Sequence, residues 1–223
     1  IYTLSLHDAL PIYELVRPLD LDLKVGDLTV LTGRSGSGKS TLLSMLAGML
    51  TPTSGVVSVD ETDMYSLDER ARSRLRNARI GLVPQGHTAL RSLTVLENVL
   101  LPAVLYSRQP PPLQRAEELL EAVGIASLAP ARPNELSGGE LRRMAVARSL
   151  LMSPGAVLAD EPTAGLDDES TADVLRLLRE TADDGAAVLV VTHEDEAMRF
   201  ADRTLTMEAG RLRPRDRKTE TQG

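Results

Sequence analysis

Cysteine and tryptophan are absent from this sequence of 223 residues, and phenylalanine occurs once, at Phe200. Without cysteine the chain has no disulfide framework and no thiolate chemistry, which fits a reducing compartment. Aromatic residues make up only 2% of the chain, so there is no platform on which single-stranded bases could stack. Hydrophobic residues make up 42%, and the core that they form must therefore be aliphatic.

The chain also lacks an excess of positive charge and a long apolar run. Its formal net charge is -7, whereas contacts to nucleic-acid phosphates need clustered lysine and arginine, so we expect no nucleic-acid partner. The longest apolar stretch, residues 93–105, is interrupted by Glu97 and Asn98 and does not reach membrane-spanning length. The length is that of one domain, with room for an inserted subdomain.

The first twelve residues, IYTLSLHDALPI, form an unusual segment. They correspond in one reading frame to a widely used short-read sequencing adapter. As a signal peptide the segment lacks a basic start, and His7 and Asp8 interrupt its apolar part. A short amphipathic entry segment is the other interpretation. We expect residues 1–12 to be an adapter artefact, with a native chain truncated near Tyr13, and leave them out of the fold prediction.

Strand and helix patterns alternate along most of the chain. Helices are expected at residues 39–50 and from a Ser-x-x-Glu capping box at residues 66–69 to residue 77. Such alternation predicts a doubly wound α/β core with a mostly parallel sheet. Strand patterns occur at residues 19–24, 28–32, 56–59, 80–83, 156–159 and 187–191.

A helical block interrupts this alternation. Residues 94–152 show several helical stretches and no convincing strand pattern. We therefore predict an inserted α-helical subdomain at 88–152, with the α/β core formed by 13–87 and 153–213. The short polar end at 214–223 is expected to be a disordered tail.

A glycine-rich loop follows the strand predicted at residues 28–32. It reads GRSGSGKS and fits the phosphate-loop pattern G-x-x-x-x-G-K-[ST]. Its glycines let the backbone N–H groups face one anion, and the following helix adds its N-terminal dipole. Lys39 would reach the β and γ phosphates of ATP, and the Ser40 hydroxyl would bind Mg²⁺. A chance match in a surface loop is the alternative, which the preceding strand and following helix disfavour. The residues of this loop are Gly33, Arg34, Ser35, Gly36, Ser37, Gly38, Lys39 and Ser40.

Two carboxylates end the apolar run at residues 156–159. Ligands of α/β folds bind at the carboxyl ends of parallel strands, which is where Asp160 and Glu161 lie. Asp160 would hold Mg²⁺ directly or through water, and Glu161 would act as the general base for an attacking water. The alternative is an acidic pair that caps a helix before Pro162.

A second potential anion site precedes the amphipathic pattern that starts at Leu141. It consists of Ser137, Gly138 and Gly139, followed by Glu140. Alone this turn is an ordinary helix N-cap. In a chain that already has a phosphate loop, a second anion site is explained by two copies arranged head to tail around shared nucleotides.

These motifs, in this order and spacing, resemble the ATP-binding-cassette (ABC) ATPases over residues 13–213. The resemblance implies a P-loop NTPase (RecA-like) core with added antiparallel N-terminal strands. It also implies that Gln85 senses the γ-phosphate and Mg²⁺, that His193 contacts the γ-phosphate and orients water, and that Asp167 lies in a loop at the dimer interface. Thr41 is counted with the phosphate loop.

Three sequence segments resemble those of the ABC subgroup that serves lipoprotein-release, macrolide-export and cell-division permeases: residues 76–85, 93–102 and 158–163. Two departures stand beside them. Pro84 replaces the phenylalanine that often precedes the glutamine, and residues 141–144 read LRRM where QQRV is commoner. Neither touches a catalytic atom, although they could alter how the helical subdomain docks. The aromatic residue on which this family stacks adenine would fall near positions 6–10, and Tyr13 lies too late, so no such residue is assigned.

The resemblance implies an ATP-hydrolysing, energy-coupling subunit of a transporter, with ATP and Mg²⁺ bound. Its expected partners are a second copy of itself and an integral-membrane permease, at the cytoplasmic face of the cell membrane. One alternative is a mechanotransmission complex in which nothing crosses the bilayer. A non-transport ABC ATPase is less favoured, because such proteins usually carry coiled-coil insertions, zinc motifs or two cassettes. Loss of catalysis is disfavoured by the intact catalytic residues.

Overall fold

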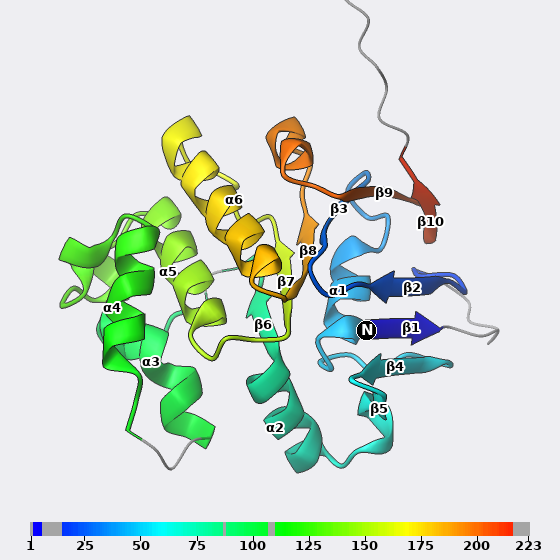
Figure 1. Cartoon of the computed structure of the whole chain (residues 1–223), viewed down its shortest axis with the longest axis horizontal. Helices are drawn as coiled ribbons and strands as arrows, with labels where there is room; N and C mark the ends of the chain where they lie inside the picture. The colour runs from blue at the N-terminus through cyan, green and yellow to red at the C-terminus, as the bar shows by residue number, and fades with distance from the viewer. Residues whose placement is uncertain (1, 6–14, 87, 107–109, 216–223) are drawn as a thin grey trace, which may run out of the picture.

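The computed structural model describes residues 2–5, 15–86, 88–106 and 110–215 of the chain. Its centre is a six-stranded sheet in the order β10-β9-β3-β8-β7-β6 (Figure 1). Five neighbouring strands run parallel, and β10 pairs antiparallel with β9 at one edge. The strands are β3 (Leu28–Thr32), β6 (Ile80–Val83), β7 (Ala156–Asp160), β8 (Ala187–Val191), β9 (Arg203–Glu208) and β10 (Arg211–Pro214).

A second, antiparallel sheet lies beside the first in the order β2-β1-β4-β5. It contains β1 (Tyr2–Ser5), β2 (Asp20–Leu23), β4 (Val56–Val59) and β5 (Thr62–Asp63). The expected α/β class, with a mostly parallel sheet and added antiparallel strands, is confirmed. Strand β1 takes part in this sheet although we left residues 1–12 out of the fold prediction. The adapter origin stays a prediction, and residues 1 and 6–14 lie outside the described part of the chain.

Both faces of the parallel sheet are buried, which explains its continuous apolar sequences. In β8 every residue is buried, and alternate side chains join two different hydrophobic clusters. Val188 and Val190 face the helical side, whereas Leu189 and Val191 face α1 (Lys39–Leu46) and the antiparallel sheet. A strand that is buried on both faces does not alternate between apolar and polar residues.

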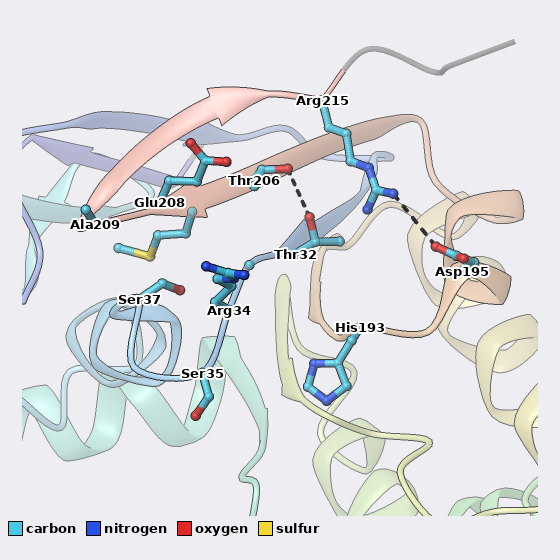
Figure 2. A pocket seen from close by; sticks show the side chains of 12 residues that line it. Thr32, Arg34, Ser35, Ser37, His193, Asp195, Thr206, Glu208, Ala209 and Arg215 are labelled. Atoms are coloured by element: carbon cyan, nitrogen blue, oxygen red, sulfur yellow. Dashed lines mark hydrogen bonds and ion pairs between the residues drawn. The ribbon is translucent and has the colours of Figure 1, made fainter.

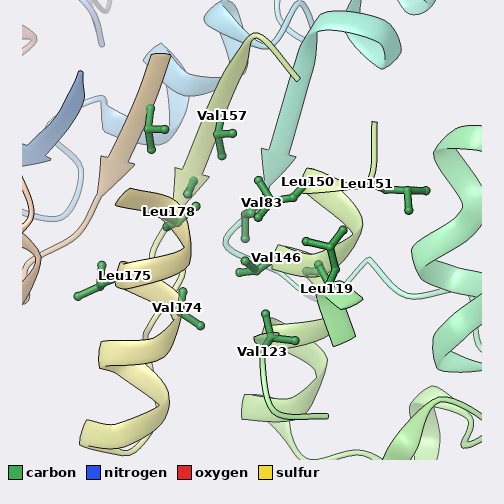
Figure 3. Packing of buried hydrophobic residues seen from close by; sticks show 14 of the residues in the cluster. Val83, Leu119, Val123, Val146, Leu150, Leu151, Val157, Val174, Leu175 and Leu178 are labelled. Atoms are coloured by element: carbon green, nitrogen blue, oxygen red, sulfur yellow. The ribbon is translucent and has the colours of Figure 1, made fainter. Parts of the chain in front are cut away.

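The helical block at residues 95–150 packs on one side of the sheet (Figure 1). Its helices are α3 (Val95–Tyr106), α4 (Leu113–Ala122) and α5 (Gly138–Leu150). Figure 3 shows that Leu119, Val146 and Leu150 lie in one cluster with Val83 and Val157 of the sheet. The block therefore shares its core with the sheet and has no separate one.

Two helices differ from their predicted bounds. Helix α1 ends at Leu46 and not at residue 50, because Gly48 adopts φ +68° and turns the chain. Helix α2 (Glu69–Arg79) is capped by Asp68, whose side chain accepts from the Ala71 N–H at 2.7 Å. The capping box predicted from Ser66 was wrong, because Ser66 belongs to a short 3₁₀ turn before the helix.

Helix α6 (Asp168–Asp183) lies between β7 and β8 in the sequence and covers the sheet. At the other end of the chain, Pro214 pairs with Leu205 in the last strand, so the sheet extends into the segment expected as a tail. Residues 216–223 lie outside the described part of the chain.

Substitution of Asn98 tests how the helical block is stabilised. It is fully buried, and its amide exchanges hydrogen bonds with the backbone of Leu90 at 2.8 and 3.0 Å and donates to Thr94 at 2.9 Å. Asn98→Ala removes the side-chain acceptor of the Leu90 N–H and leaves the Leu90 and Thr94 carbonyls only their backbone donors. We expect a loss of about 1–3 kcal/mol in the free energy of unfolding, measured by urea denaturation. The exposed Asn134→Ala is the control, and equal effects of the two variants would contradict this account.

Candidate nucleotide-binding site

The register of the parallel strands aligns the predicted motifs at one edge of the sheet. Val191 of β8 lies opposite Leu31 of β3 on one side and Asp160 of β7 on the other. Val83 of β6 lies opposite Ala159. The residues that follow these four strands therefore emerge side by side at their carboxyl ends, where open α/β sheets bind ligands.

The phosphate loop leaves the sheet after Thr32. Gly33, Gly36 and Gly38 have φ values of +145°, +76° and +104°, which favour glycine. At Gly33 a Cβ atom would lie 2.4 Å from the Met207 carbonyl oxygen, so no larger residue fits against β9. The loop curls into α1, which begins at Lys39 and gives the loop a helix N-terminus.

Lys39 lies inside this curl. Its Nζ donates to the carbonyl oxygens of Gly33 at 2.7 Å and Arg34 at 3.0 Å. The residue is largely buried, whereas Ser40 beside it is exposed. The next residue, Thr41, is half-buried in the first turn of α1. A lysine cation at the N-terminus of a helix suits a multiply charged phosphate chain.

A pocket of about 970 Å³ opens beside the loop. Gly33, Arg34, Ser35 and Ser37 line one side, and His193 lines another (Figure 2). Strand β9 and the turn after it close the pocket. On its rim, Arg215 forms an ion pair with Asp195 at 3.8 Å. The pocket thus joins the phosphate loop to the segment after β8.

Glu161 directly follows β7 and meets His193, which follows β8. The Oε1 atom of Glu161 lies 3.1 Å from Nδ1 of His193. Burial raises the pKa of Glu161, and the proximity of His193 and a hydrogen bond from the Thr192 side chain oppose this rise. The His193 side chain is 72% exposed and open to a ligand, while Glu161 is buried.

Three predicted oxygen ligands for Mg²⁺ come from neighbouring elements. Asp160 is the last residue of β7, and Gln85 follows β6, which pairs with β7. Ser40 lies in the first turn of α1, and this helix packs against β7. Within the described residues no cluster of three or more His, Cys, Asp or Glu side chains could hold a metal by itself. One carboxylate with hydroxyl and amide oxygens suits Mg²⁺, which is often completed by water and substrate phosphates.

The second motif lies in a different place. Ser137 caps α5 and forms a capping box with Glu140, whose carboxylate accepts from the Ser137 N–H at 2.7 Å. Ser137, Gly138 and Gly139 line a pocket of about 380 Å³ together with Asp167. Asp167 itself caps α6 and accepts from the Ser170 N–H at 2.8 Å.

These two pockets have no lining residue in common within the described chain. One chain therefore brings the phosphate loop, Glu161 and His193 together, but does not add Ser137 or Asp167 to that group.

Sequence reasoning missed two contacts near the site. The Arg142 guanidinium donates to the backbone carbonyl of Glu161, and the Thr163 hydroxyl bonds Glu194, the residue after His193. The only sequence signal for Arg142 was its departure from the glutamine that is commoner there. Thr163 carried no signal of its own. The position expected for adenine stacking, near residues 6–10, and Tyr13 lie outside the described residues.

The sequence pattern of the family described as ABC transporter matches residues 16–164. A lipoprotein-releasing system ATP-binding protein, LolD of Pseudomonas syringae pv. tomato, is 43% identical over 87% of this chain and 86% of its own length. An uncharacterised ABC transporter ATP-binding protein of Mycobacterium tuberculosis is 42% identical over 86% of this chain, which spans only 58% of that longer protein.

Solved structures agree with this relationship. The dimeric ATP-binding cassette MJ0796 bound to ADP and Pi matches with a TM-score of 0.89 and 32% identity, over 96% of this chain and 98% of the other. A second dimeric structure of the same cassette has a TM-score of 0.88. In the described part of this chain, none of the helices has the length and apolarity needed to cross a bilayer.

The raised pKa of Glu161 predicts a pH-dependent cost to stability. The folded state keeps its proton above the ordinary glutamate value of 4.5, so stability falls as pH rises from there through the raised pKa. Glu161→Gln removes the ionisable group. We expect the variant to match the wild type near pH 4 and to melt at higher temperature near pH 8, in the absence of nucleotide.

Thermal melting of both proteins across this pH range checks the expectation. The exposed Glu117→Gln on α4 is the matched control and should show no such divergence. A wild type that stays as stable as Glu161→Gln at pH 8 would show that burial does not penalise the Glu161 carboxylate.

Proposed function

This chain belongs to the ABC transporter ATP-binding family, and from that premise we propose that it hydrolyses ATP to drive a membrane permease of the lipoprotein-releasing type. The observation that carries the proposal is the alignment of Gly33, Glu161 and His193 at one edge of the sheet. The permease places the subunit at the cytoplasmic face of the cell membrane.

In this proposal the phosphate loop binds the triphosphate. The backbone N–H groups of residues 33–40 and the Lys39 ammonium contact the β and γ phosphates, and Thr41 extends this contact into the first turn of α1. Ser40, Gln85 and Asp160 would hold Mg²⁺, which when bound neutralises charge on the phosphate oxygens. The exposed Ser40 hydroxyl and the packing of α1 against β7 support this set.

Glu161 is the proposed general base. Its Oε2 atom has no hydrogen-bond partner within the described chain, so no protein donor there competes for the proton that it would take from water. The water oxygen attacks the γ-phosphorus, the bond to the β-phosphate oxygen breaks, and ADP and phosphate leave. A raised pKa brings the base nearer to the working pH, where proton transfer is most effective. His193 fixes the carboxylate through Oε1.

The second pocket supports a head-to-tail dimer. Ser137, Gly138 and Gly139 present a helix N-terminus, yet they line a pocket separate from the phosphate loop of their own chain. In a second copy they would meet the γ-phosphate that is bound to the first, with Asp167 beside the interface. Loss of that phosphate on hydrolysis removes the group that both copies share, and the dimer opens.

Glu161→Gln tests this function. The variant keeps the shape of the side chain but cannot accept the proton, so we expect ATP binding to persist while turnover falls by about 10²–10⁴-fold. ATP with Mg²⁺ should then convert the variant into a stable dimer, measured by size-exclusion chromatography with light scattering.

The exposed Glu117→Gln is again the control and should retain wild-type ATPase activity. Wild-type turnover in Glu161→Gln would reject Glu161 as the base. An inactive wild-type protein that does not bind ATP would reject the function itself.

A further inference from the structure

Arg142 connects the helix of the second anion site to the base of the first site. It lies in the first turns of α5, just after Ser137 and Gly139. Its Nη1 donates to the backbone carbonyl of Glu161 in the same chain. Arg142 also lines the second pocket. One side chain therefore lines the second pocket and also contacts the backbone of Glu161.

Glu161 has an unfavourable backbone conformation that needs support. Its φ is +52°, in the left-handed region that residues with a Cβ atom avoid. The conformation turns the chain out of β7 and directs the carboxylate toward His193. On one side it is held by the Glu161 N–H, which donates to the Val191 carbonyl at 2.8 Å. Such a conformation persists only where surrounding contacts fix it.

The carbonyl of Glu161 accepts from the Arg142 guanidinium and, over a longer distance of 3.3 Å, from the Ala164 N–H. Glu161 directly follows the last residue of β7 and precedes Pro162, which has no N–H, and it is only 4% exposed. A buried carbonyl must find a donor, and a charged guanidinium forms a stronger bond than a neutral group. The Val191 carbonyl thus holds the Glu161 N–H, while the charged Arg142 and the Ala164 N–H hold its carbonyl.

We propose that Arg142 is a positioning residue that holds Glu161 in its hydrolytic geometry and links that geometry to the placement of α5. The inference rests on the proposed function of Glu161 as general base. Because α5 begins at the turn that would contact a partner's ATP, a shift of this helix reaches the base of its own chain through Arg142. Such a contact makes hydrolysis at one site depend on occupancy of the other.

Neighbouring contacts make the first turns of α5 a rigid support for this link. A Cβ atom at Gly139 would lie 3.0 Å from a Leu166 methyl group, so the helix start packs closely on the loop before α6. One residue after Arg142, Arg143 donates to the Ser170 hydroxyl at 3.3 Å. The arginine at position 142, where the family more often has glutamine, adds a longer and charged donor to this support.

The position of Arg142 predicts a specific kinetic effect. It does not line the pocket beside the phosphate loop, so ATP affinity should be independent of it. Arg142→Met keeps the length of the stem and removes the donor. We expect kcat of the full-length chain to fall by about tenfold or more, with KM for ATP within about twofold of wild type.

Two further variants serve as a conservative replacement and as a control. Arg142→Lys keeps a charged donor and should recover part of kcat, which also covers the case in which Arg142→Met fails to fold. Arg176→Met removes an exposed arginine from α6 and should leave both constants unchanged. If Arg142→Met keeps the wild-type kcat, or if KM rises as much as kcat falls, the positioning role is rejected.

A double-mutant cycle with Glu161→Gln separates this inference from the proposed function. If Arg142 acts through Glu161, the double variant should be no slower than Glu161→Gln alone. An equal further loss in the Glu161→Gln background would overturn the inference and leave the proposed function intact. Full turnover in Glu161→Gln alone would contradict the proposed function, and with it the basis of this inference.

Discussion

The parallel pairing of β3, β8 and β7 is the constraint on which the site depends. Leu31, Val191 and Asp160 lie opposite one another, so the phosphate loop, His193 and Glu161 leave the sheet at the same level. A shift of one residue would exchange the side chains between the two hydrophobic clusters, which are different in shape and content. The aliphatic core thus fixes the register, and the register fixes the chemistry.

The site combines features that favour the binding of phosphate with features that destabilise the fold. The glycine loop and the N-terminus of α1 suit negative charge, and two loop carbonyls hold the Lys39 ammonium beside them. Glu161 is buried, has a left-handed backbone and has a carboxylate oxygen that no other described residue contacts by a hydrogen bond. These features destabilise the fold locally, and proteins retain such strain mainly where it serves function. Contacts from β8 and α5 hold it in place.

The sequence predicted the elements whose signal is local and missed those fixed by distant partners. The apolar runs of β3, β7 and β8 follow from burial on both faces, and the loop at Gly33 follows from its glycine spacing. Strands β9 and β10 were missed, because the pattern at residues 203–214 is short and rich in charge. The place of β9 is set by pairing with β3, and that of β10 by pairing with β9. The Arg142 contact was missed for the same reason, since it joins residues from two elements.

The central claim is that one chain supplies halves of two different nucleotide sites. Mixing inactive subunits tests this most directly: one carries Lys39→Ala, and the other carries Gly139→Asp, which places a carboxylate where an anion should bind. The account predicts that each variant alone is inactive and that the mixture regains part of the ATPase activity, because mixed dimers contain one site with neither change, although their second site stays empty. A mixture as inactive as its components, although mixed dimers form, would contradict the account.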